Sequence, residues 1–128
     1  MNTNLHTILI ADDEKLLRWA ICQAFTKAGF KVITVTDGSQ ALAELEKTKF
    51  KIDLIISDYK MPNLNGLELY RQSSQINPAL KFVIITAYKT EVERLLGEDT
   101  VRVKILQKPF DLEELQQIVN QQIAEVNK

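Results

Sequence analysis

The chain has 128 residues, of which 45% are hydrophobic and 26% are charged, and its formal net charge is −1. This length fits one compact domain, and we expect residues 1–128 to form it. A nearly neutral charge argues against direct, non-specific binding to nucleic acid, and the apolar stretches are too short to span a membrane. With no charged leader and with Cys22 as its single cysteine, the chain is expected to be cytoplasmic.

Five short apolar runs, rich in β-branched residues, predict five strands. In chain order they cover residues 6–11, 31–35, 52–57, 81–86 and 102–106. The first, third and fourth runs lack the alternation of apolar and polar residues, which is typical of strands that are covered on both faces.

The segments between these runs have the spacing of amphipathic helices. The expected helices cover residues 14–28, 39–48, 66–74 and 90–96, and a last helix begins at Asp111 with Glu114 in its capping box. Strand and helix therefore alternate five times, and this alternation predicts a doubly wound α/β fold with a parallel sheet and helices on both faces.

Polar side chains follow four of the five expected strands, at the edge where open parallel sheets bind their ligands. They are Asp12, Asp13 and Glu14 after the first strand, Asp58 after the third, Thr86 at the end of the fourth and Lys108 after the fifth. Clustered carboxylates repel one another, and an all-oxygen set of ligands suits Mg²⁺. A carboxylate beside Mg²⁺ can attack phosphorus, while an amine and a hydroxyl stabilise the phosphoryl oxygens. The pattern thus predicts a magnesium-dependent site for phosphoryl transfer.

Four motifs at set intervals resemble the response-regulator receiver domain of two-component signalling. They are the Asp12-Asp13 pair, the segment "DYKMPNLNG" that begins at Asp58, "ITAY" with Thr86, and "KPF" with Lys108. The resemblance covers essentially the whole chain and implies a flavodoxin-like fold with five helices and strand order 2-1-3-4-5. It also implies a signalling module rather than an enzyme. Such a module takes a phosphoryl group from a sensor histidine kinase or phosphotransfer protein and signals to a downstream protein or output domain.

The resemblance implies a role for each residue of the magnesium site. Asp58 would be the phosphoacceptor. Asp12 and Asp13 would bind Mg²⁺ together with Asp58 and the backbone carbonyl of Lys60.

The resemblance also implies a switch. Thr86 would turn its hydroxyl toward the phosphoryl group, Lys108 would form an ion pair with that group, and the peptide bond before Pro109 is a candidate for the cis form. Ile105 stands where many receivers carry Tyr or Phe. It is either an ordinary core-facing strand residue or a sign that the usual aromatic switch is altered.

Further hypotheses concern the surroundings of Asp58. Tyr88 would shield the phosphoryl group from water and Lys60 would pair with one of its oxygens, unless both side chains simply point into solvent. Leu17 and Arg18 are expected to meet the histidine-bearing helices of the kinase, although a core position fits Leu17 nearly as well. Dimerisation that depends on phosphorylation is a further expectation.

Three other functions compete with this interpretation. A flavodoxin-like nucleotide or flavin binder would need an anion-binding loop after the first strand, where this chain has acids. A haloacid-dehalogenase-like phosphatase would carry an acid two residues after its nucleophile, where this chain has Lys60. The third alternative is a receiver-fold interaction module that signals by binding alone, without phosphorylation.

Overall fold

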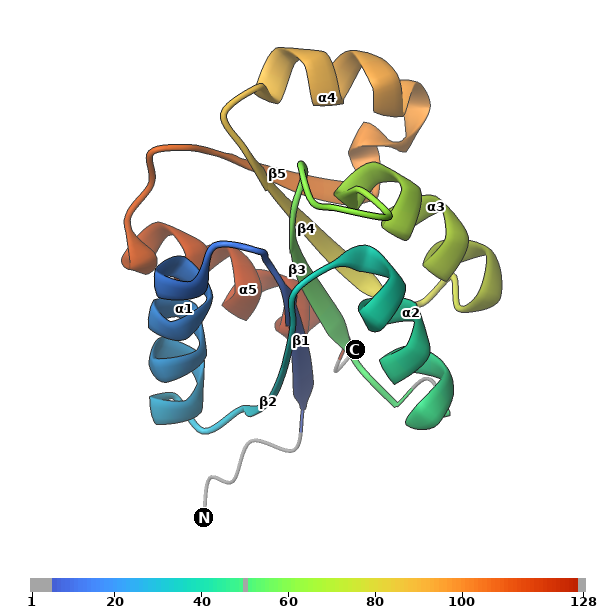
Figure 1. Cartoon of the computed structure of the whole chain (residues 1–128). Coiled ribbons are helices and arrows are strands. Elements are labelled where there is room, and N and C mark those ends of the chain that lie inside the picture. The colour runs from blue at the N-terminus through green and yellow to red at the C-terminus, as the bar shows by residue number, and fades with distance from the viewer. Residues whose placement is uncertain (1–5, 50, 127–128) are drawn as a thin grey trace.

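The computed structural model describes residues 6–49 and 51–126, so residues 1–5, 50 and 127–128 of the expected domain lie outside the described part. Figure 1 shows one sheet surrounded by helices. The strands are β1 (Thr7–Ala11), β2 (Lys31–Val35), β3 (Leu54–Asp58), β4 (Lys81–Thr86) and β5 (Val103–Gln107). The helices are α1 (Lys15–Lys27), α2 (Gly38–Lys47), α3 (Gly66–Ile76), α4 (Lys89–Leu96) and α5 (Leu112–Val126), and a 3₁₀ helix, η1 (Gly97–Val101), follows α4.

The strands pair in parallel in the order β2-β1-β3-β4-β5, which confirms the predicted doubly wound topology. The bounds of β2 and β4 agree with the prediction. Each end predicted for the other elements either agrees as well or differs by one or two residues. Strand β3 includes Asp58 as its last residue, so the expected phosphoacceptor is held by the central strand itself.

Two apolar cores cover the two faces of the sheet, because successive strand residues point to opposite faces. In β1, Ile8 and Ile10 belong to the core that also contains Phe25 of α1 and Val119 of α5, whereas Leu9 and Ala11 belong to the other core. Figure 1 shows the same arrangement, with α1 and α5 on one side of the sheet and α2 and α3 on the other. Burial on both faces explains why the central strands lack alternation.

Side-chain caps define where several helices begin. Asn65 and Glu68 form a reciprocal capping box at the start of α3, and Asp37 accepts a hydrogen bond from the backbone N–H of Gln40 at the start of α2. Asp111 accepts the backbone N–H of Glu114 at 2.9 Å, so half of the predicted capping box is present at α5. Among the helices of the described residues, none combines the length and apolar character needed to cross a membrane.

Gly66 allows the loop after β3 to fold back onto that strand. A Cβ atom at this position would lie 2.5 Å from the carbonyl oxygen of Asp58, which is too close for any other residue. The Gly66 N–H donates to the carbonyl of Tyr59 at 2.8 Å. The glycine therefore permits α3 to begin directly beside the end of β3.

Candidate functional site

The ends of three strands and the residues that follow them meet at one edge of the sheet. Asp58 ends β3, and β1 and β4 lie on its two sides in the sheet, so Asp12 follows one neighbouring strand and Thr86 ends the other. Lys108 follows β5, and its backbone N–H donates to the carbonyl of Thr86 at 2.8 Å. The topology alone thus brings together groups from distant parts of the chain.

Three carboxylates form the centre of this site. One oxygen each from Asp12, Glu14 and Asp58 can be chosen so that all three atoms lie within 4.8 Å of one another. Asp13 is exposed and lies outside this cluster, so the structure brings Glu14 to Asp12 and Asp58 where the sequence analysis expected Asp13. A tight turn accounts for the difference, because the backbone N–H of Glu14 donates to Oδ1 of Asp12 at 2.8 Å just before α1 begins.

Asp12 carries an unbalanced charge in this cluster. Its residue is 1% exposed, and among the described residues its Oδ2 atom is the buried side-chain atom that has no hydrogen-bond partner. Burial raises the pKa of Asp12 to about 6, against the lowering effect of the Glu14 backbone N–H, and the nearby charge of Asp58 adds to the rise. Oxygen ligands at this spacing, with a buried carboxylate oxygen that lacks a partner, fit a small divalent cation such as Mg²⁺.

Lys108 is the cation of the site. Its Nζ atom lies 3.0 Å from Oε1 of Glu14 and 3.3 Å from Oδ1 of Asp58. Burial lowers the pKa of Lys108, but the hydrogen bond to Glu14 and the charge of Asp58 outweigh it, so the pKa is raised. The pKa of Asp58 is also raised, because its burial outweighs the attraction of Lys108. One lysine therefore does not neutralise the cluster.

Residues 86–89, which we call the switch loop, connect β4 to α4. Thr86 is 2% exposed, and its hydroxyl oxygen accepts the backbone N–H of Tyr88 at 2.9 Å. The side chain of Gln107, at the end of β5, holds the same loop from outside. Its Nε2 donates to the carbonyl of Ala87 at 2.9 Å and its Oε1 accepts the N–H of Lys89 at 3.2 Å.

Ile105 and Pro109 lie two residues before and two residues after Gln107 in the sequence. Ile105 is half-buried and packs against the core that α2, α3 and α4 cover. The peptide bond between Lys108 and Pro109 is cis.

Lys60 and Tyr88 face each other across the mouth of the site. The Nζ atom of Lys60 lies 4.1 Å from the centre of the Tyr88 ring, a cation–π contact, although both side chains are exposed. A cavity of about 90 Å³ lies beneath them, lined also by Asp58, Thr86 and Lys108. The two side chains thus border the space in front of the carboxylate of Asp58.

An apolar groove of about 690 Å³ lies next to the cluster, between α1 and the loop from β5 to α5. Leu16, Leu17 and Phe110 line it together with Lys108. Leu16 is 82% exposed, so most of its side chain is open to solvent. Arg18 does not line this groove; its guanidinium donates to the backbone carbonyl of Asp12 at 2.8 Å.

Two residues of the site were not assigned a role from the sequence. Glu14 was visible as the third acid of the "DDE" run, but its place depends on the turn at Asp12. Gln107 pairs with Thr86 in the parallel register of β4 and β5. Its place directly before Lys108 was the signal in the sequence that it lies near the site. Within the described residues, the carbonyl of Lys60 accepts no backbone hydrogen bond, and its part in metal binding stays a prediction.

Known proteins share the sequence pattern and the fold of this chain. Residues 8–120 match the family model described as "Response regulator receiver domain". The chain is 34% identical over 113 residues to the DNA-binding transcriptional regulator NtrC of Azospirillum brasilense, which covers 88% of this chain and 23% of that protein. It is 32% identical over 108 residues to the response regulator receiver protein CpdR of Brucella abortus, covering 84% of this chain and 88% of that protein.

A solved structure shows the same fold. The response regulator TrrA of Thermotoga maritima, crystallised in complex with Mg(2+)-BeF, superposes with a TM-score of 0.78 at 25% identity, covering 92% of this chain and 99% of that chain. The chain spans about a quarter of the length of the NtrC relatives that it matches. A family match over most of the sequence and a fold shared with solved response regulators lead to one assignment: the chain belongs to the response regulator receiver domain family.

Proposed function

We propose that Asp58 accepts a phosphoryl group and that the protein is switched by this modification. The observation that carries the proposal is the cluster of Asp12, Glu14 and Asp58 beside Lys108, in which a buried carboxylate oxygen lacks a partner. In the transfer step, an oxygen of Asp58 forms a bond to phosphorus while the bond between phosphorus and the donor's leaving oxygen or nitrogen breaks. The product is an acyl phosphate on the central strand.

The side chains around Asp58 would divide the work of stabilising this product. Asp12 and Asp58, with Glu14 or Asp13 as a third acid and the carbonyl of Lys60, would hold Mg²⁺. When bound, Mg²⁺ would neutralise the repulsion between the carboxylates and the incoming phosphoryl oxygens. The Lys108 ammonium, already 3.3 Å from Asp58, would pair with a second oxygen.

Thr86 would report the modification to the switch loop. Its hydroxyl now accepts a hydrogen bond and has a proton free to donate, so a phosphoryl oxygen on Asp58 could recruit that proton. Turning the side chain of Thr86 inward would change the loop that leads into α4, which biases two arrangements of that helix. The signal would then reach a downstream protein or an output domain, because the matched region covers only 23% of the NtrC relative.

Slow hydrolysis fits a signalling timer better than a catalyst. Position 60 holds a lysine, where phosphatases of this chemistry carry the carboxylic acid that protonates the leaving group. Tyr88 and Lys60 border the cavity in front of Asp58, where they would limit the access of water to the phosphoryl group. We propose a cytoplasmic location, where sensor kinases present their phosphohistidine.

Intact-protein mass after incubation with acetyl phosphate and Mg²⁺ tests the proposal. We expect a single phosphoryl adduct on the wild-type chain and none on Asp58→Asn, because the amide is not a nucleophile. Asp99→Asn is the matched control, since it removes one acid away from the cluster, and it should be labelled like the wild type. Labelling of Asp58→Asn, or labelling of the wild type without divalent metal, would contradict the proposal.

The groove beside the cluster is the proposed docking site for the phosphohistidine helix of the kinase. It is apolar, it reaches Lys108, and Leu16 is exposed at its rim. We expect Leu16→Ser to slow transfer from a phosphorylated histidine-phosphotransfer protein by about tenfold to thirtyfold, because burying one leucine is worth about 2 kcal/mol. Labelling by acetyl phosphate should stay unchanged, since this small donor needs no groove.

Val101→Ser is the control for this prediction. Val101 is 87% exposed and lies on η1, so the variant removes a comparably exposed apolar side chain at another place. Equal rates of protein-to-protein transfer in the wild type and Leu16→Ser would place the docking surface elsewhere.

A further inference from the structure

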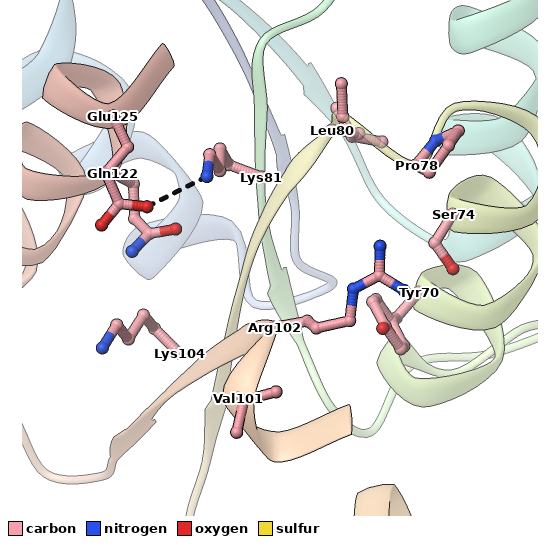
Figure 2. A pocket seen from close by; sticks show the side chains of 11 residues that line it. Tyr70, Ser74, Pro78, Leu80, Lys81, Val101, Arg102, Lys104, Gln122 and Glu125 are labelled. Atoms are coloured by element: carbon pink, nitrogen blue, oxygen red, sulfur yellow. Dashed lines mark hydrogen bonds and ion pairs between the residues drawn. The ribbon is translucent and has the colours of Figure 1, made fainter. Parts of the chain in front are cut away.

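A second cavity lies at the opposite edge of the sheet, where β4 and β5 begin. It has a volume of about 300 Å³, and α3, the start of β4, the start of β5 and the end of α5 form its walls. Figure 2 shows the polar side chains around it: Tyr70, Lys81, Arg102, Lys104, Gln122 and Glu125. Asp58 and Lys108 are at the other ends of their strands, so phosphorylation makes no direct use of this cavity.

Cations outnumber acids around the cavity. Lys81, Arg102 and Lys104 line it together with one carboxylate, that of Glu125. The ion pair between Lys81 and Glu125, at 3.0 Å, uses that carboxylate and appears as the dashed line in Figure 2. Within residues 6–49 and 51–126, no carboxylate pairs with Arg102 or Lys104, so the cavity carries an excess of positive charge.

Two buried side chains add hydrogen-bond donors. Tyr70 is 3% exposed and Gln122 is 4% exposed, and both line the cavity. In the described part of the chain, neither the Tyr70 hydroxyl nor the Gln122 amide has a hydrogen-bond partner within the protein, and neither group is fully shut off from solvent, so both polar ends reach the open space of the cavity. Their unused donors open into the same space that the cations surround.

The donors come from both sides of the sheet edge. In Figure 2, Tyr70 and Arg102 lie toward α3, while Lys81 and Gln122 lie toward α5. A ligand between them would therefore meet donors on two sides and cations at its rim. A volume of about 300 Å³ equals that of about ten water molecules, which limits the ligand to roughly ten non-hydrogen atoms.

We propose that this cavity is a binding site for a small oxyanion, a compact phosphate ester or a polycarboxylate. Both classes offer several acceptor oxygens and negative charge, which match an excess of cations and two donors that have no acceptor within the protein. The site is independent of the phosphoacceptor, and a ligand in it would hold α3, β5 and α5 together. Binding to the folded state alone would raise the thermal stability of the domain.

Amide chemical shifts of the ¹⁵N-labelled chain, titrated without divalent metal at low ionic strength, test this proposal. Glycerol 3-phosphate and malate, each of about ten non-hydrogen atoms, serve as separate probes for the two classes. We expect saturable shifts at residues 80–82, 102–104 and 122–125 with at least one probe, and a response to one probe alone assigns the class. No saturable shifts with either probe, or shifts centred on residues 58 and 108, would overturn the proposal.

Two double variants that remove the same charge distinguish specific binding in the cavity from non-specific attraction of an anion to a positively charged protein surface. Replacing Arg102 and Lys104 together by glutamine should weaken binding by about tenfold or more, because each removes a charged hydrogen-bond donor. Replacing Lys27 and Lys31, two exposed lysines of α1 and β2, by glutamine removes the same charge and should change the affinity by less than about twofold. Equal losses in the two double variants would overturn the proposal.

Gln122→Leu tests the buried donor without changing charge. The variant should weaken binding by about threefold to tenfold, because one hydrogen bond to an anion is lost. The melting temperature without ligand should stay nearly equal, since the Gln122 amide has no hydrogen-bond partner within the protein and leucine has a similar size. Unchanged affinity in this variant would show that Gln122 takes no part and would contradict the proposed geometry.

Discussion

Asp37 stabilises the junction between β2 and α2 by accepting four hydrogen bonds, three at its carboxylate and one at its backbone carbonyl. It accepts the backbone N–H of Gln40 at 2.9 Å, the hydroxyl of Ser39 at 2.8 Å and the side-chain amide of Asn63 at 2.9 Å, and the carbonyl of Asp37 receives the N–H of Ala41. These donors, with the Gln40 N–H first, lower the pKa of Asp37. The ionised form therefore stabilises the fold.

Asp37→Asn is expected to lower the free energy of unfolding by about 1 kcal/mol at pH 7, because charged hydrogen bonds become neutral ones. The asparagine would also turn an amide donor toward the amide of Asn63. A lowered pKa means that the contribution of Asp37 is present above the usual value of 3.8 and is lost as the pH falls through the lowered value. Urea unfolding at pH 7 and near pH 3 should therefore show a difference between the proteins that shrinks in acid.

Glu46→Gln is the control, because it removes one negative charge from the exposed face of the same helix. It should change the unfolding free energy by less than about 0.5 kcal/mol. A difference for Asp37→Asn that is independent of pH would mean that the charge of Asp37 contributes nothing to stability.

The residues of the site could be predicted where the sheet topology fixes their position, and less well where the local geometry of a turn does. Asp12, Asp58, Thr86 and Lys108 were located from the rule that the carboxyl ends of parallel strands meet, and the structure brings them together. The choice between Asp13 and Glu14 depends on one turn of backbone, which no periodicity reveals. The position of Gln107 beside Lys108 indicated that it lies near the site, but its side-chain hydrogen bonds depend on the path of the switch loop, which the sequence does not reveal.

At the scale of elements, the side chain of Gln107 links β5 to the start of α4 by hydrogen bonds. With Ile105 packed in the core, no aromatic ring at that position can follow Thr86. Gln107→Leu removes the hydrogen bonds to Ala87 and Lys89 while keeping similar size. Each such bond contributes about 1 kcal/mol, so we expect amide hydrogen exchange in residues 87–91 to accelerate by about tenfold.

Lys104→Leu is the matched variant on the same strand, since Lys104 is exposed on β5 and makes no contact with the switch loop among the described residues. It should leave exchange in residues 87–91 unchanged. Exchange in Gln107→Leu that equals the wild-type rate would show that the switch loop is held by the backbone and Thr86 alone.

The order and type of the elements were predictable because each carries its own local signal. Helices α2 and α3 begin at Asp or Asn caps, and the buried strands read as continuous apolar runs. The short helix η1 was not predicted, since the segment "GEDTV" has neither an apolar stripe nor a cap.

At the scale of the whole molecule, the acidic cluster couples metal binding to stability. Asp12 is buried with a partnerless oxygen and with a pKa raised to about 6, so its ionised form opposes folding in the absence of metal. By linkage, the metal-free protein loses this part of its stability as the pH rises from the usual value of 3.8 through about 6. The charge that destabilises the empty cluster is the same charge that attracts a divalent cation.

Asp12→Asn is therefore expected to raise the free energy of unfolding of the metal-free protein at pH 7 by about 1 kcal/mol, because the buried charge is removed. Mg²⁺ at ten times its dissociation constant should stabilise the wild type by about 1.4 kcal/mol and the variant hardly at all. Denaturant unfolding with EDTA and with Mg²⁺ measures both effects, and Asp99→Asn should behave like the wild type. A variant less stable than the wild type without metal would mean that Asp12 supports the fold through its hydrogen bond to Glu14 more than its charge opposes it. Equal stabilisation of both proteins by Mg²⁺ would instead place the metal away from Asp12.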